Sequence, residues 1–65
     1  MIHEAKIEFC VVAEYTNGDR FCLAKFMHEE DGRNYRRSRK KKDYVSWKLY
    51  RRTESRSGEV EWEEI

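Results

Sequence analysis

Residues 6–27, KIEFCVVAEYTNGDRFCLAKFM, decide the fold of this chain. β-forming residues flank Asn17-Gly18 on both sides, and Asn-Gly supplies the two positive-φ positions of a type I′ turn. The stretch therefore predicts a β-hairpin over 6–27, with one strand at Lys6 to Tyr15 and the other at Arg20 to Met27.

A two-residue turn also sets the register of this hairpin: it pairs Val11 with Ala24, and alternate side chains share a face. One face is continuously apolar and is expected to form the core; it carries Ile7, Phe9, Val11, Ala13, Cys22, Ala24 and Phe26. The opposite face is mixed, with Val12, Phe21 and Leu23 among polar residues. We expect a second layer or a partner to cover these three side chains.

A second hairpin is predicted over 44–64, around a loop at 54–58. Apolar and polar residues alternate in both of its strands, which is the period of a half-buried strand. If Leu49 pairs with Trp62, then Trp47 and Trp62 both lie on the inner face and pack in the core. The outer face then sets Lys48, Tyr50 and Arg52 opposite glutamates.

Residues 28–43 are predicted to form an acidic turn and a basic loop, because Asp31-Gly32 is a turn signal that could also close a short extra strand. The alternative is a helix over 34–42, which would offer only Tyr35 to a core. The whole chain, residues 1–65, is then one mainly β domain, or an α+β domain with one short helix. Its antiparallel sheet of four to five strands is built from the two hairpins and could curl into an open barrel.

The composition predicts a thin core, since 42% of the 65 residues are charged and 38% are hydrophobic. A chain of this length buries only roughly 60% of the surface that it exposes when unfolded, so a homodimer could supply missing apolar contacts. No stretch approaches the roughly 20 apolar residues of a membrane span, and the first residues lack the pattern of a secretory signal. We therefore expect a cytoplasmic protein that contacts no membrane.

Positive charge is concentrated in the middle of the chain, although the net charge is only +1. Residues 33–52 hold ten Lys and Arg against one acidic residue, whereas 1–32 hold three against seven and 53–65 hold one against five. Lysine and arginine displace counterions from phosphate backbones, and interleaved aromatic rings can stack on unpaired bases. The sequence predicts a nucleic-acid-binding site that consists of Arg33, Tyr35, Arg36, Arg37, Arg39, Lys40, Lys41, Lys42, Tyr44, Lys48, Tyr50 and Arg52. The alternatives are a solvated loop balanced by the acidic ends and, for Arg39-Lys40-Lys41-Lys42, a nuclear-import signal.

Four side chains are of the types that bind zinc: His3, Cys10, Cys22 and His28. The predicted register places Cys10 and Cys22 on opposite faces of the first hairpin, which argues against a shared zinc ion and against a disulfide. His28 precedes the acidic run 29–31 and could transfer protons, but no nucleophile motif or phosphate-binding loop accompanies it. We therefore predict no metal, no cofactor and no enzymatic activity.

Two resemblances bear on function. The tracts Asp31-Gly32-Arg33-Asn34-Tyr35 and Tyr44-Val45-Ser46-Trp47-Lys48-Leu49 resemble the small three-stranded arm-DNA-binding domains of some transposon integrases, although the helix that should follow is lacking. The proline-free, single-domain build with segregated charge is also similar to that of small phage-encoded accessory proteins, which typically bind and inhibit a host factor. The sequence therefore leaves two functions open. One is a nucleic-acid-binding module, and the other is a protein-interaction or inhibitor module that binds an acidic protein surface through its charges, an edge strand or a homodimer face.

Overall fold

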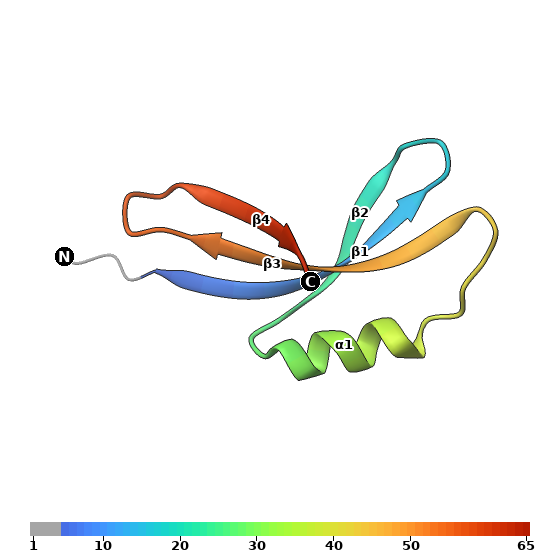
Figure 1. Ribbon diagram of the computed structural model, residues 1–65, viewed down its shortest axis with the longest axis horizontal. Helices are drawn as coiled ribbons and strands as arrows, with labels where there is room; N and C mark the ends of the chain where they lie inside the picture. The colour runs from blue at the N-terminus through green and yellow to red at the C-terminus, as the bar shows by residue number, and fades with distance from the viewer. Residues whose placement is uncertain (1–4) are drawn as a thin grey trace.

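A computed structural model describes residues 5–65 and shows an antiparallel sheet with one helix against it (Figure 1). The elements are β1 (Lys6–Tyr15), β2 (Arg20–Phe26), α1 (Glu29–Ser38), β3 (Val45–Glu54) and β4 (Val60–Glu64). Over these residues the four strands lie in the order β2-β1-β3-β4, so β2 and β4 are the edges. The predicted fold class is confirmed. The sheet is open, because closure into a barrel would require β2 to pair with β4.

The first hairpin turns through three residues rather than two. Tyr15 N–H donates to Asp19 O (2.8 Å) and Gly18 N–H donates to Tyr15 O (2.9 Å), so the loop is residues 16–18. Gly18 has a φ of +96°, whereas Asn17 does not have a positive φ, so the predicted type I′ turn is wrong. A left-handed residue at the third position is typical of three-residue hairpin loops.

A β-bulge in β2 compensates for the extra loop residue. Next to the turn the pairs are Val12–Cys22, Ala13–Phe21 and Glu14–Arg20, and beyond the bulge they are Phe9–Phe26, Cys10–Lys25 and Val11–Ala24. Leu23 lies between the two sets without a partner in β1. The predicted register is confirmed beyond the bulge and wrong next to the turn. There, Cys22 moves to the face of Cys10, and Phe21 moves to the face of Ala13.

The register of the second hairpin differs from the predicted one by an odd number of residues. Trp62 pairs with Arg52 rather than with Leu49. Because side chains alternate along a strand, this shift reverses the two faces of β4. Trp62 is therefore not in the core: it is 51% exposed, and its ring lies 6.4 Å from the ring of Tyr50, centroid to centroid.

Helix α1 replaces the turn and short strand that Asp31-Gly32 predicts. Its first turn is acidic and its last turn is basic, and both charges favour a helix through its dipole. Gly32 is buried against the sheet, where a Cβ would lie 2.8 Å from Leu49 Cδ1 and 3.5 Å from Phe9 Cβ. This glycine lets the helix approach the sheet closely. In Figure 1, α1 lies below β1 and β3.

The core is small and lies in the two central strands. Its buried residues are Cys10, Val11, Val12, Ala13, Val45 and Leu49. The predicted core residues Ile7 and Cys22 are exposed instead, because Ile7 lies beyond the last pair with β2 and Cys22 lies on an edge strand. Of the three apolar residues predicted to need a second layer, Val12 is already buried, whereas Phe21 and Leu23 are exposed.

Candidate nucleic-acid interface

Six of the predicted site residues lie in one run, which we call the basic segment. They are Arg36, Arg37, Arg39, Lys40, Lys41 and Lys42. The run begins in the last turn of α1 and leads toward the start of β3, so it forms the connection between helix and sheet (Figure 1). Its side chains are exposed except for Arg36, which is half-buried.

Specific contacts hold the basic segment against the rest of the protein. Trp47 Nε1–H donates to Lys40 O (3.0 Å), so a side chain of β3 fixes the path of the segment. Two cations lie over tyrosine rings: Arg39 over Tyr35 at 4.5 Å from the centroid and Lys42 over Tyr44 at 5.7 Å. The predicted loop is therefore held to the sheet by Trp47, and it contacts the tyrosines on either side of it in the sequence.

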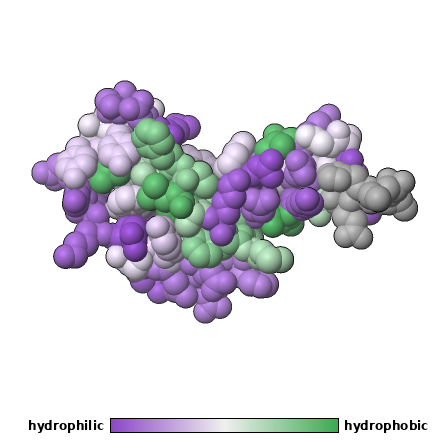
Figure 2. All heavy atoms as spheres, turned by 180° about the vertical axis from the view of Figure 1, so that it is seen from behind, coloured by the Kyte–Doolittle hydropathy of each residue, from purple (hydrophilic) through white to green (hydrophobic). Residues whose placement is uncertain are grey.

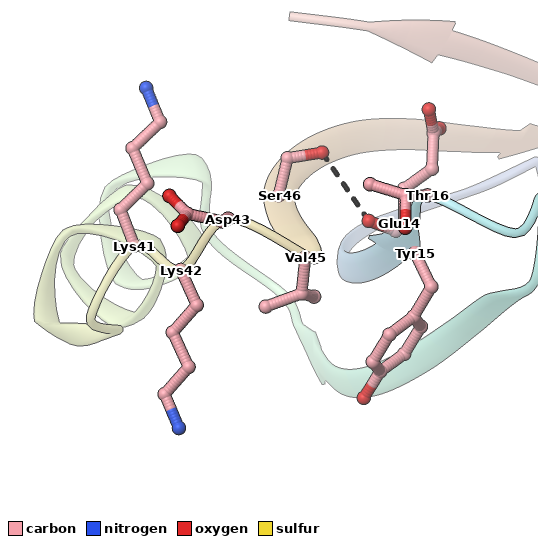
Figure 3. Close-up of a pocket in the computed structure, with 8 residues that line it drawn as sticks. All are labelled: Glu14, Tyr15, Thr16, Lys41, Lys42, Asp43, Val45 and Ser46. Carbon is pink, nitrogen blue, oxygen red and sulfur yellow. Dashed lines mark hydrogen bonds between the residues drawn. The ribbon is translucent and has the colours of Figure 1, made fainter.

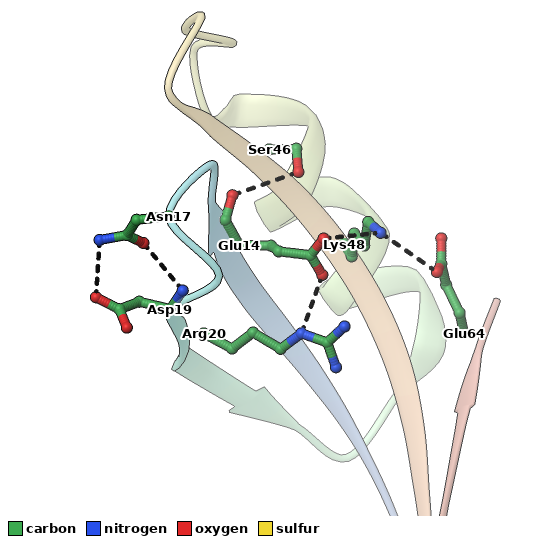
Figure 4. A network of polar contacts seen from close by, with 7 residues as sticks. All are labelled: Glu14, Asn17, Asp19, Arg20, Ser46, Lys48 and Glu64. Carbon is green, nitrogen blue, oxygen red and sulfur yellow. Dashed lines mark hydrogen bonds and ion pairs between the residues drawn. The ribbon is translucent and has the colours of Figure 1, made fainter.

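The predicted site cations outside the basic segment are paired with carboxylates. Lys48 lies 3.3 Å from Glu14 on β1 and 3.9 Å from Glu64 on β4, in the network of Figure 4. The other pairs are Arg52 with Glu8 (3.9 Å), Arg52 with Glu54 (3.6 Å) and Arg33 with Glu29 (2.8 Å). These partners offset the positive charge that the sequence assigns to the site.

By contrast, no residue of the basic segment forms an ion pair with a carboxylate within residues 5–65. The acidic residues of β4 that form ion pairs contact cations of β3 instead. Glu63 pairs with Arg51 (2.7 Å), which raises the pKa of that guanidinium through a hydrogen bond and through charge. The structure thus divides the predicted site into unpaired cations in the basic segment and paired cations on α1 and β3.

The three tyrosines predicted to stack on bases have different environments. Tyr35 is half-buried between Arg39 and the Phe26 ring, whose centroid is 5.5 Å away. Tyr50 packs edge-on against Trp62, away from the basic segment. Tyr44 is 54% exposed and is separated from the segment only by Asp43, and its ring stacks at 6.4 Å from that of Tyr15. Tyr44 is therefore the tyrosine best placed to meet a ligand bound there.

A surface pocket of about 500 Å³ lies where the end of β1 meets the basic segment (Figure 3). Its lining residues include Lys41 and Lys42 as well as the carboxylate residues Glu14 and Asp43, so opposite charges are balanced there. In Figure 3 the side chains of Lys41 and Lys42 project in opposite directions. The segment therefore presents cations on two sides.

A second pocket, which we call the Trp47 pocket, has a volume of about 420 Å³. It is lined by Arg36, Arg37, Arg39, Lys41, Ser46, Trp47, Lys48 and Glu64. A smaller pocket of about 340 Å³ on the same tryptophan is lined by Lys40 and Lys42 among others. Trp47 is not a predicted site residue, because its alternation with Val45 and Leu49 indicates a core position. Its place in the sequence among aromatic and basic residues is the signal for a role at the surface.

Cys10 and Cys22 lie on the same face of the first hairpin, so the prediction that they lie on opposite faces is wrong. Burial raises the pKa of the Cys10 thiol to about 11, and the neighbouring Cys22 thiol adds to the rise. Both are free thiols. His3 lies outside the described residues, and within residues 5–65 no three His, Cys, Asp or Glu side chains are grouped as a metal site would require.

Comparison of the chain with protein-family models, with curated proteins and with solved structures gives no match. In the described part of the chain, no helix has the length and apolar character needed to cross a membrane. The geometry of the basic segment and its surroundings is therefore the basis for a proposed function.

Proposed function

We propose that this protein is a non-enzymatic module that binds the phosphate backbone of nucleic acid through the basic segment. One observation carries the proposal: six cations within residues 36–42 form no ion pair with a carboxylate in the described chain, whereas Lys48, Arg51 and Arg52 on β3 all do. Unpaired Lys and Arg side chains release counterions when they bind phosphates, which favours association.

The positions of the acidic residues support this reading over that of a solvated, internally balanced loop. Glu8 and Glu14 on β1, and Glu63 and Glu64 on β4, all contact cations of β3. None of these ion pairs includes a residue of the basic segment. Intramolecular neutralisation therefore acts on the sheet and leaves the segment available to an external anion.

The test compares two variants with the same net charge. In the first, the exposed cations Arg37, Lys40 and Lys41 are changed to Gln; in the second, the exposed cations Lys6, Lys25 and Arg56, outside the segment, are changed to Gln. Fluorescence anisotropy of labelled single-stranded and duplex oligonucleotides is measured over a salt series. Each lost phosphate contact lowers the slope of log affinity against log salt by about 0.7 for single strands and about 0.9 for duplex DNA.

In the segment variant, the magnitude of the slope of log affinity against log salt should fall by up to about 2.1 with single strands and about 2.7 with duplex DNA. Both figures correspond to the loss of three phosphate contacts. The control variant should keep the slope of the wild type. Equal losses in both variants would show that binding follows net charge rather than the segment. Binding that does not respond to salt, or no binding at low salt, would contradict the proposal.

A second candidate function, protein binding through an edge strand, is favoured by β2. Its outer edge has no partner within the described sheet, and it exposes Phe21 (54%) and Leu23 (46%). Figure 2 shows an apolar band, drawn in green, that follows the position of β2 between polar margins. Exposed edge strands accept further strands from other chains or from a second copy. Light scattering of the wild type and of Leu23→Lys tests this: a dimer that the substitution dissociates supports it, and a monomer in both contradicts the homodimer.

A further inference from the structure

The Trp47 pocket combines three features. Its volume of about 420 Å³ lies within the range of small-ligand sites, about 300–1,000 Å³. Arg36, Arg37, Arg39 and Lys41 line it without carboxylate partners among the described residues. Its carboxylate, that of Glu64, is already opposite Lys48 at 3.9 Å. The pocket is therefore suited to an anionic ligand that also has an apolar surface.

The backbone of Trp47 faces this pocket. Leu49 O accepts a hydrogen bond from Ile65 N–H (3.0 Å), so the polar backbone groups of Leu49 point toward the β4 side of β3. Backbone groups point to alternate sides along a strand, so those of Trp47 point the same way. The pairing of β3 with β4 begins only at Tyr50, so within the described residues β4 provides no partner for Trp47.

These backbone groups bear on the chemistry of the ligand. Two residues before Trp47, Val45 N–H donates to Lys42 O (3.3 Å), and two residues after it Leu49 O accepts from Ile65 N–H. The N–H and C=O of Trp47 form no backbone hydrogen bond with another described residue. They present an adjacent donor and acceptor, a pattern that the edge of a nucleobase matches. The indole ring beside them supplies a surface for stacking.

We propose that the Trp47 pocket binds one unpaired nucleotide, with its base against Trp47 and the adjoining phosphates on Arg36, Arg37 and Lys41. This inference rests on the proposed function and names its ligand as a single-stranded nucleic acid. In a duplex the base edges are already paired and the base faces are stacked, so only a single strand can place a base in the pocket.

The two tryptophans allow a direct test, because they lie on opposite faces of the sheet and pair with different partners. Trp62→Phe leaves Trp47 as the fluorescent reporter, and Trp47→Phe leaves Trp62 as the matched control. Each variant is titrated with a short oligouridylate, with a duplex of the same length and with inorganic tripolyphosphate. Circular dichroism confirms that each variant is folded, and anisotropy of labelled oligonucleotide measures binding independently.

Oligouridylate is expected to quench Trp47 fluorescence strongly and to leave Trp62 unchanged, because base–indole stacking quenches the ring that it contacts. Duplex and tripolyphosphate should produce little quenching of either tryptophan. Trp47→Leu should weaken oligouridylate binding about 5-fold to 150-fold, the range for loss of one stacked base, and leave tripolyphosphate binding unchanged.

Three results would overturn the inference. If oligouridylate binds by anisotropy without quenching Trp47, the basic segment binds nucleic acid but the pocket takes no base, so the proposed function stands and this inference fails. If the duplex binds more tightly than the single strand, the ligand class is wrong. If no nucleic acid binds in anisotropy, the inference fails together with the proposed function.

Discussion

Gly32 provides a quantitative test of how α1 packs on the sheet. In Gly32→Ala, the added Cβ would lie 2.8 Å from Leu49 Cδ1, which is fully buried. Carbon atoms in contact are about 3.5–4.0 Å apart, so helix or leucine must move by about 0.7–1.2 Å. Overpacking of this kind costs about 1–3 kcal/mol, whereas alanine favours a helix over glycine by about 0.8–1.0 kcal/mol. We expect a net destabilisation of about 1 kcal/mol, or about 4–8 °C in Tm.

A double-mutant cycle with Leu49→Val separates the two contributions. Valine has no Cδ atoms, so in this background Gly32→Ala should stabilise the protein by about 0.8–1.0 kcal/mol through helix propensity alone. The four free energies of unfolding come from urea denaturation followed by circular dichroism. The expected coupling energy is about 2 kcal/mol. If Gly32→Ala stabilises both backgrounds equally, with coupling below about 0.5 kcal/mol, the close approach of Gly32 to Leu49 is refuted.

Three further predictions concern the turn, the paired cations and the buried thiol. Gly18→Ala places a side chain at a φ of +96° and should lower the free energy of unfolding in urea by about 1–2 kcal/mol; no change would contradict the left-handed turn. Glu14→Gln releases Lys48 from its 3.3 Å ion pair, so the salt slope for single-stranded binding should steepen by about 0.7, and an unchanged slope would argue against this partition of charge. Burial raises the pKa of Cys10 from 9.0 to about 11, so the folded state keeps a proton that the unfolded chain loses. The free energy of unfolding should therefore be fully maintained below pH 9 and fall between pH 9 and 11, and Cys10→Ala should remove that decline in urea titrations at each pH.

The strands could be predicted from local pattern, because alternation and turn glycines act over a few residues. The first strand extends from Lys6 to Tyr15 both in the prediction and in the structure. The register next to the turns could not be predicted, because a three-residue loop differs from a two-residue loop by one position. The bulge at Leu23 then restores the register of the paired strand. Helix α1 also depends on tertiary structure. In the sequence Gly32 indicates a turn, and only its close contact with Leu49 in the folded protein explains a glycine within a helix.

The candidate site shows the same division. The sequence by itself determines where positive charge is dense, because residues 36–42 are consecutive and no fold can disperse them. Which cations remain unpaired is decided by topology: Glu14 from β1 and Glu64 from β4 flank Lys48 only because the strands lie in the order β2-β1-β3-β4. Trp47 enters the site for the same reason, since β3 carries it past the end of β4 to the basic segment. Charge density is a property of neighbours in the chain, whereas charge neutralisation depends on neighbours in space, which long-range strand pairing sets.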